Sequence, residues 1–471
     1  MRNVHAFGDD CLGDLDATGL AAELAAGRVS ALEAVEAALD RIDRVNGVLN
    51  AVAFDDSDRA RKRAVDNNFP AGGFAGVPSI IKNNTKFAGL PTCFGSGAVP
   101  PHPAPADEAF TRQLVSTGVN IVGASTLPAF GLTATTEFDD RPPTRNPWDT
   151  DYSCGASSGG SAALVASGAL PIAHANDGGG SIRIPAAACG LVGLKSSRGR
   201  LASSEASEQA PIDLVANGIV SRSVRDTAGF LASAETYRRA PGFDPVGLVT
   251  GPSDRRLRVA VLTEPLASDS LDADSLRAVD EVRTLLESLG HRTETIAIPV
   301  GKSFVDDFVD YWSLMAFSLE YFGKRVVAKD FDRSRIDPFT HGLAGRFRRR
   351  FWRMPAVIRG LNRSTVEFLS VFQRFDVVLS PTLGHTTPRI GYLDPAGDFD
   401  EIFARLMRYV AFTPANNTSG APGISLPLAR TDAGLPLGIH FSADVGDERT
   451  LLELAFELEA AQPFARIGAS R

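Results

Sequence analysis

The stretch Gly155–Gly190, GASSGGSAALVASGALPIAHANDGGGSIRIPAAACG, holds two serine–glycine clusters separated mostly by small residues. The first cluster is Ser157–Gly160, and the second is Gly178–Ser181. Glycine adopts backbone conformations that other residues avoid and lets a ligand come close to the main chain, at a cost in stability. Two such clusters this close together predict backbone amides arranged around a small, negatively charged group.

The residues between the clusters predict how the chain folds around them. Ser161 to Gly168 is typical of a helix of small residues that stops at a glycine, and Leu170 to Ala175 is typical of a buried strand. The second cluster follows that strand, after Asp177. This order places Ser181 at a strand end, beside unhindered backbone amides.

Helices and strands alternate along the rest of the chain. Residues 77–81 and 119–125 are apolar runs typical of short buried strands, and the first leads into Lys82. Residues 257–289 indicate a strand followed by an amphipathic helix, and 423–443 indicate a hairpin. The alternation favours one α/β core with a mixed sheet.

Two helices are predicted near the N-terminus. Thr18 is placed to cap a short helix that stops at Gly27. Ser30 followed by Glu33 is the pattern of a capping box, and the apolar residues after it recur at helical spacing.

Composition narrows the class of protein. The 471 residues are 44% hydrophobic and 22% charged, with a net charge of −8, so a nucleic-acid-binding face is not favoured. The four cysteines are widely spaced, which favours neither a disulfide framework nor a metal site. The N-terminal residues lack the apolar core of a signal peptide, and no apolar run is long enough to span a membrane. These features predict a cytoplasmic protein.

Residues 301–370 differ from the rest because they are rich in aromatic residues and arginine. One interpretation is a helical layer whose arginines extend to solvent. The other is a cap segment whose aromatic side chains line a substrate pocket. The candidate pocket walls, each equally compatible with simple core packing, are Tyr311, Trp312, Met315, Phe317 and Trp352.

Ser181 is the candidate nucleophile, but a serine hydroxyl needs a base. His174 lies seven residues earlier, within the predicted strand, where a histidine is more often a packed core residue. Lys82 ends an apolar segment, where burial would disfavour its charged form. No G-x-S-x-G elbow surrounds Ser181, so the triad of α/β-hydrolases is poorly supported.

Several motifs resemble those of the amidase signature family, in order along nearly the whole chain. Ser157 and Ser181 are 24 residues apart, which is the family's spacing of its two catalytic serines. The motifs are GVPSIIKNN, RNPWD, GASSGGSAALVASG, NDGGGSIRIPAAACGLVGLKSSRGR, GIVSRSVRDTA, NNTSGAPGISLPL and GLPLGIHF.

The resemblance implies a fold and a set of site residues. The fold is a single catalytic domain over residues 1–471, with a central mixed, twisted sheet flanked by helices. Ser181 would be the nucleophile, Ser157 the bridging serine after a cis peptide bond from Ala156, and Lys82 the base. The oxyanion hole would be formed by the amides of Gly178, Gly179 and Gly180, with Ser158, Asp177 and Arg183 in support.

The implied activity is hydrolysis of a small-molecule linear amide to an acid and an amine or ammonia, through an acyl-enzyme and without metal or organic cofactor. Two alternatives stay open: the amidase subunit of a glutamine-dependent tRNA amidotransferase, and a hydrolase of cyclic amides like the nylon dimer. A homodimer is left open as well. The chain departs from the family pattern at Asn83, where an aspartate is usual, and at Ala156, where a glycine is usual.

Overall fold

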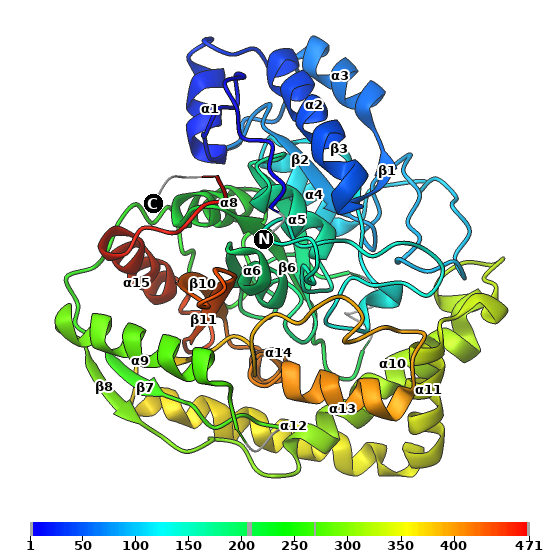
Figure 1. The fold of residues 1–471 in the computed structure, drawn as a ribbon, viewed down its shortest axis with the longest axis vertical. Helices are drawn as coiled ribbons and strands as arrows, with labels where there is room; N and C mark the ends of the chain where they lie inside the picture. Colours follow the sequence, from blue (N-terminus) through cyan, green and yellow to red (C-terminus); the bar gives the residue numbers. More distant parts are fainter. Residues whose placement is uncertain (1–2, 205–209, 268–269, 469–471) are drawn as a thin grey trace.

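The computed structural model describes residues 3–204, 210–267 and 270–468. Its strands form two sheets (Figure 1). The smaller sheet has the strand order β1-β3-β2, in which β3 pairs antiparallel with β1 and parallel with β2. Its strands are β1 (Val52–Asp55), β2 (Pro78–Lys82) and β3 (Asn120–Ser125).

The larger sheet has eight strands in the order β4-β6-β5-β10-β11-β9-β7-β8. Its pairs are antiparallel from β4 to β9 and parallel between β9, β7 and β8, so the sheet is mixed as the sequence predicts. The strands are β4 (Ile172–Asp177), β5 (Val192–Lys195), β6 (Ala216–Ser221), β7 (Arg258–Val261), β8 (Arg292–Thr295), β9 (Val377–Pro381), β10 (Gly423–Arg430) and β11 (Pro436–Ser442).

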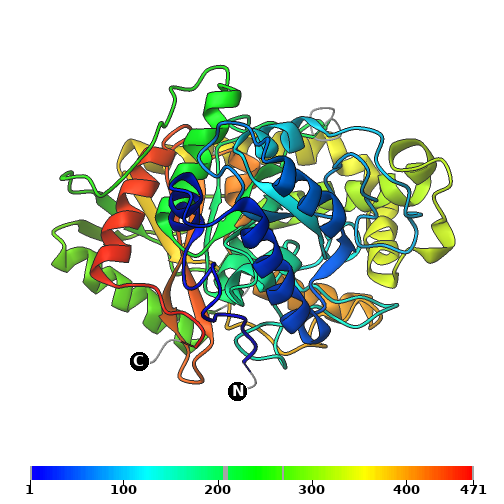
Figure 2. The same ribbon diagram turned by 90° about the horizontal axis from the view of Figure 1, so that it is seen from above.

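Helices flank both sheets, and α9 and α15 both pack against β10 on one flank of the molecule (Figure 2). The helices are α1 (Ala17–Ala25), α2 (Ala31–Leu49), α3 (Ser57–Asp66), α4 (Ala109–Ser116), α5 (Gly159–Ala166), α6 (Arg183–Cys189), α8 (Val224–Tyr237), α9 (Ala273–Ser288), α10 (Phe304–Val326), α11 (Pro338–Arg350), α12 (Met354–Leu369), α13 (Phe399–Tyr409), α14 (Pro414–Ser419) and α15 (Glu448–Ala461). Short 3₁₀ turns lie at Ala129–Gly131, Arg333–Arg335, Phe351–Arg353 and Ser370–Gln373.

The N-terminal helices test two predicted caps. The Ser30–Glu33 capping box is present at the start of α2. The prediction that Thr18 caps α1 is wrong: Asp16 is the cap, and its carboxylate accepts from the Gly19 amide. The Thr18 hydroxyl instead donates to Asp226 on α8, since a carboxylate from a distant helix offers it an acceptor.

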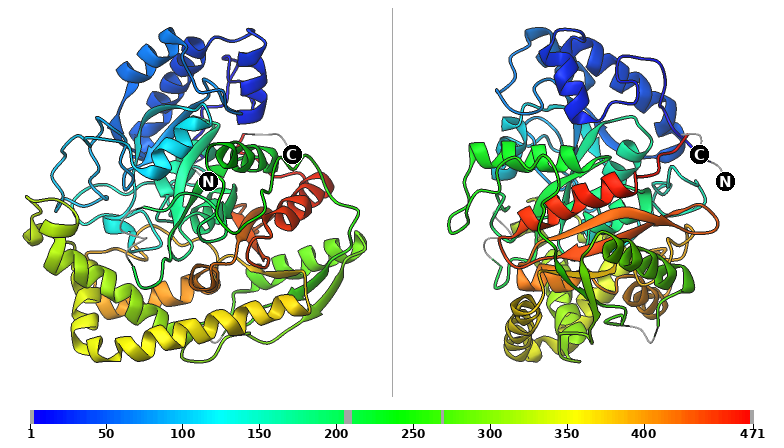
Figure 3. Two further views of the ribbon diagram at one scale, coloured as in Figure 1. Left: turned by 180° about the vertical axis from the view of Figure 1, so that it is seen from behind. Right: turned by 90° about the vertical axis from the view of Figure 1, so that its left-hand side faces the viewer.

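Most of residues 301–370 form the helices α10, α11 and α12, which lie at the end of the molecule opposite α1–α3 (Figures 1 and 3). Buried Asp310 on α10 forms ion pairs with Arg346, Arg350 and Arg353, which join α10 to α11 and the turn after it. Much of the arginine content of this segment therefore serves the packing of its own helices. Within the described ranges, no helix is both long and apolar enough to cross a bilayer.

Candidate active site

Lys82 ends β2 and points at two groups that come from other parts of the fold. Its Nζ donates to Ser157 Oγ at 2.7 Å and to Asn176 Oδ1, on β4, at 2.6 Å. Its backbone amide donates to His174 Nδ1, also on β4, at 3.1 Å. These bonds join the small sheet to the edge of the large one, at the base of the site.

The surroundings of Lys82 favour its neutral form. The side chain is completely buried, and this burial lowers the pKa of the amine from 10.5 to about 7, although the charge of Asp177 acts in the opposite direction. Near neutral pH, a large share of the molecules therefore carries an amine that can accept a proton.

Ser157 lies in the turn before α5, and the peptide bond between Ala156 and Ser157 is cis, as the resemblance implies. Its side chain is almost fully buried. Gly131, with φ +70°, lies against it, because a Cβ built on Gly131 would be 3.0 Å from Ser157 Oγ. The positive φ and this close contact both favour glycine at position 131.

Ser181 follows Gly180 in the turn between β4 and α6 and is partly exposed. No hydrogen bond joins its hydroxyl to Ser157 or to any other group that the structure describes. Of the predicted proton route, the hydrogen bond between Lys82 and Ser157 is therefore formed, whereas the one between Ser157 and Ser181 is not. Hydrogen bonds of this kind often close only when substrate binds.

The three glycines before Ser181 do not have equivalent amides. The Gly180 amide donates to Asp177 Oδ1 at 2.7 Å, so it is engaged within the protein. The amides of Gly178 and Gly179 have no acceptor in the described part of the chain. Of the three predicted oxyanion donors, the structure leaves these two available, because the neighbouring carboxylate takes the third.

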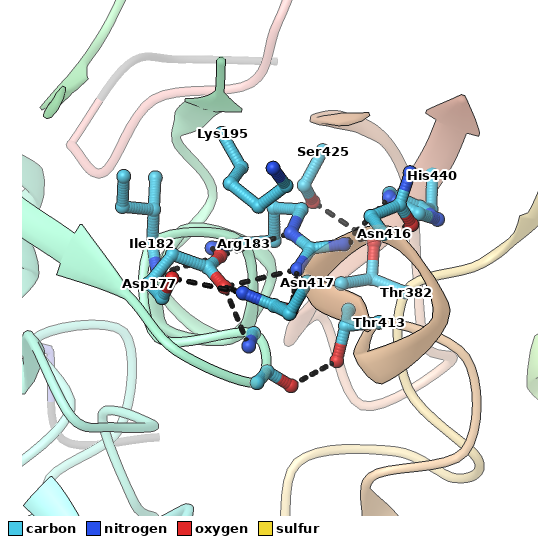
Figure 4. Close-up of polar contacts among 12 residues, drawn as sticks. Asp177, Ile182, Arg183, Lys195, Thr382, Thr413, Asn416, Asn417, Ser425 and His440 are labelled. Carbon is cyan, nitrogen blue, oxygen red and sulfur yellow. Dashed lines mark hydrogen bonds and ion pairs between the residues drawn. The ribbon is translucent and has the colours of Figure 1, made fainter. Parts of the chain in front are cut away.

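Asp177 and Arg183 form a fully buried ion pair beneath this turn (Figure 4). Arg183 Nε and Nη2 each donate to the carboxylate at 2.9 Å, and the Ile182 amide donates to it at 3.1 Å. Burial alone would raise the pKa of Asp177, but the charge and hydrogen bonds of Arg183 hold it well below its usual range. The carboxylate therefore stays ionised and ties both ends of the turn together.

The remaining donors of Arg183 are satisfied from the C-terminal part of the chain (Figure 4). Nη2 donates to Asn417 at 2.7 Å, and Nη1 donates to Asn416 and to His440 Nε2 at 3.1 Å each. Burial and the Arg183 charge lower the pKa of His440 well below its ordinary value, so the ring is neutral and accepts this bond. These residues lie in motifs quoted above, but nothing in the sequence assigned them a role.

Ser158 and Asn83 also have defined contacts. The Ser158 hydroxyl donates to the Asn176 carbonyl at 3.3 Å, which ties the first serine–glycine cluster to β4. The Asn83 amide accepts from the Cys93 amide at 3.0 Å and donates to the Pro91 carbonyl at 2.8 Å. An aspartate could not make the second bond, so asparagine at this position suits the loop that it holds.

Four of the five candidate pocket residues lie on α10 and differ in burial and contacts. Tyr311 is buried, and its hydroxyl bonds with both the amide and the carbonyl of Ile212 at 2.8 Å. Phe317 stacks on Tyr321, and Met315 is 38% exposed. Trp312 packs against the apolar cluster that contains Leu132 and Ile184.

Phe308 is a residue that sequence reasoning missed. It lies on α10 against the turn of Gly178 to Gly180, which we call the oxyanion turn after its predicted role: a Cβ built on Gly179 would be 3.4 Å from its ring. The exposed Trp352 has no such contact with the turn. Helical spacing could have singled Phe308 out only if the face of α10 toward the turn were known.

Other candidate nucleophiles and bases are inert here. Burial and the nearby Lys82 lower the pKa of His174 to about 3, so this ring is neutral, and it accepts a hydrogen bond instead of relaying protons to Ser181. Burial raises the pKa of the Cys154 thiol to about 12 and that of Cys189 well above its ordinary value. Among the residues that the structure describes, no cluster of His, Cys, Asp or Glu could hold a metal ion.

Known proteins are similar to this one along almost the whole chain. The family model described as Amidase matches residues 33–452. The protein named "Putative amidase AmiC" of Mycobacterium leprae is 48% identical, and the alignment covers 99% of each chain. The 6-aminohexanoate-cyclic-dimer hydrolase of a Pseudomonas species is 31% identical over 95% of each chain.

A solved structure of 6-aminohexanoate cyclic dimer hydrolase complexed with substrate has the same fold. It superposes with a TM-score of 0.86 at 27% identity and covers 97% of this chain and 98% of its own. With the family match and the identity to relatives over their full length, the chain belongs to the amidase signature family of amide hydrolases.

Proposed function

We propose that this protein hydrolyses carboxylic acid amides to a carboxylic acid and an amine or ammonia, with Ser181 as nucleophile, Ser157 as bridging hydroxyl and Lys82 as base. The observation that carries the proposal is the 2.7 Å bond between the buried Lys82 amine and Ser157 Oγ. A surface lysine beside a serine would stay charged, whereas this one has a pKa of about 7 because it is buried.

The first half of the reaction forms a tetrahedral intermediate on Ser181. Neutral Lys82 takes the proton of Ser157, and Ser157 takes the proton of Ser181 as its oxygen attacks the amide carbon. Negative charge then develops on the carbonyl oxygen of the substrate. The free amides of Gly178 and Gly179 are the donors that would stabilise it.

The second half reverses the proton route. The proton held on Lys82 returns through Ser157 to the leaving nitrogen, since an amine is a poor leaving group unless it is protonated. The C–N bond breaks, and Ser181 keeps the acyl group. Water then attacks this ester under the same base, which releases the acid and restores the Ser181 hydroxyl.

The substrate class is a small-molecule amide, with linear amides as the first candidate. A cyclic amide is the second, and the full-length likeness to the cyclic-dimer hydrolase of Pseudomonas favours it. We further propose that residues 301–370 act as a cap over a single catalytic domain, because Phe308 of α10 lies against the oxyanion turn. Cytoplasmic localisation is proposed on composition alone.

A panel of amides tests the activity. Purified protein is incubated with acetamide, hexanamide, acetanilide, glutamine and the cyclic dimer of 6-aminohexanoate, and the released acid and amine are measured. Turnover of one or more is expected, and Ser181→Ala should abolish it. The matched control is Ser196→Ala, because Ser196 is a buried serine whose hydroxyl has no partner in the described structure.

Full activity in Ser181→Ala would refute the nucleophile. Copurification with partner subunits, together with no turnover of any amide except glutamine, would favour the amidotransferase subunit instead.

A further inference from the structure

Thr413 makes a contact with the oxyanion turn that the proposed reaction does not yet use. It precedes α14, is buried, and its hydroxyl donates to the Gly179 carbonyl at 2.6 Å (Figure 4). Some 230 residues of sequence separate the two groups. The bond is therefore a tertiary contact made to this turn by the C-terminal part of the chain.

With this bond, the peptide group between Gly179 and Gly180 is held at both of its polar ends. The carbonyl of the Gly179–Gly180 peptide is held by Thr413, and the N–H of the same peptide is held by Asp177 at 2.7 Å. A peptide group is planar, so two hydrogen bonds at its opposite ends fix its orientation. The amides of Gly178 and Gly179 precede this fixed peptide and have no acceptor in the described residues. The fixed peptide therefore restricts the directions in which these two N–H groups point.

Close packing makes the contact specific. A Cβ built on Gly180 would be 2.4 Å from Thr413 Oγ1, and Gly180 has φ +134°, so only glycine leaves room for the hydroxyl. The helix behind Thr413 is anchored one turn later by Asn417. Its side-chain amide donates to the Asp177 carbonyl at 2.8 Å and to the Leu214 carbonyl at 2.9 Å.

We propose that Thr413 is a positioning residue for amide hydrolysis, which orients the Gly178–Gly179 amides for the oxyanion; this rests on the proposed function. Three successive glycines have more conformational freedom than any other tripeptide. Without a bond from outside the turn, their amides would have to be ordered during each reaction. Donors that are aligned beforehand cost no such reorganisation, and this is where most of their catalytic effect comes from.

Two substitutions separate the hydroxyl from the rest of the side chain. Thr413→Val keeps the branched shape and removes the donor, whereas Thr413→Ser keeps the donor and removes a methyl group. The control is Thr382→Val, because the buried Thr382 hydroxyl contacts Ser425 at 2.9 Å instead of the turn.

For each variant, kcat and KM are measured with the best amide of the panel. The rate at which a fluorophosphonate–rhodamine probe labels Ser181 is measured as well, since that reaction also places negative charge on an oxygen near the turn.

Thr413→Val should lower kcat about 10- to 100-fold, the cost of slightly misplaced donors, with little change in KM. Probe labelling should slow in parallel. Thr413→Ser should restore most of both rates, and Thr382→Val should match the unmodified protein. The pH dependence should not move in any variant, because the Lys82–Ser157 bond is untouched.

Unchanged kcat in Thr413→Val, or an equal loss in Thr413→Ser, would overturn the proposal. If Thr413→Val does not fold, Thr413→Cys replaces it, since a thiol is a weak donor. Failure of the proposed function has a different signature: Ser181→Ala would still turn over amide and still take up the probe. When Ser181→Ala is inactive but Thr413→Val is normal, only the role of Thr413 is refuted.

Discussion

Replacing Lys82 by methionine should make the protein inactive and yet more stable at neutral pH. Lys82 is fully buried, and burial lowers the pKa of its amine from 10.5 to about 7. In the unfolded chain the amine returns to its ordinary pKa, so near pH 7 unfolding is favoured by proton uptake. A methionine of similar length has no proton to gain and removes this penalty.

The size of the effect follows from the two pKa values. With 10.5 unfolded and about 7 folded, the penalty is about 4 kcal/mol at pH 7 and about 2 kcal/mol at pH 9. Methionine also loses the hydrogen bonds to Ser157 and Asn176, at about 1 kcal/mol each. Lys82→Met should therefore gain about 2 kcal/mol at pH 7 and almost nothing at pH 9.

The assay is thermal unfolding of both proteins at the two pH values. The difference in Tm, variant minus unmodified, should be positive at pH 7 and close to zero at pH 9. Exposed Lys62→Met serves as the control and should show no such pH dependence. A variant that is less stable at pH 7, or a difference that grows with pH, would mean that the folded protein stabilises the charged lysine. The assignment of Lys82 as the base would then fail.

Four further outcomes are expected. The value of kcat/KM should rise with pH through a midpoint near 7, because only neutral Lys82 accepts a proton; a flat profile between pH 5 and 9 would contradict this. Asn83→Asp should move that midpoint upward, since a negative neighbour favours the charged amine, and activity measured against pH checks this. The same variant should have a lower Tm in a melting curve, because the bond to the Pro91 carbonyl is lost. Asp177→Asn should destabilise the protein by about 3–5 kcal/mol, because it leaves the buried Arg183 unpaired, as measured by urea unfolding. Met315→Ala should leave KM unchanged for every amide of the panel, because this side chain is 38% exposed; a raised KM would support Met315 as a pocket wall.

Local pattern was enough to predict many of the elements that carry the site. The buried strand before the second serine–glycine cluster is β4, and the predicted hairpin is formed by β10 and β11. Both are apolar runs bounded by turn residues, a signal that depends on near neighbours only. The same signal located β2, but it could not assign β2 and β4 to different sheets, since pairing between distant strands leaves no trace in either strand alone.

Within the candidate site, the sequence predicted only the contacts between residues that lie in recognisable motifs. Lys82 and Ser157 are in contact as the resemblance implies, because each residue could be identified by its place within a family motif. Thr413 and Asn417 act on the turn from a distant part of the sequence, and threonine and asparagine are too common for composition to single them out. For a related reason the sequence did not single out Phe308 of α10: richness in aromatic side chains does not say which of them face the turn.

The two sheets that hold Lys82 and Asn176 share no backbone ladder within the described residues, and side-chain bonds join them at the base of the site. The position of the Lys82 amine therefore depends on contacts between the two sheets, whereas each ladder depends on the bonds within its own sheet. Turnover should therefore be lost as soon as the contact between the two sheets is disturbed. On gentle heating, activity should disappear at temperatures where far-ultraviolet circular dichroism still reports intact secondary structure.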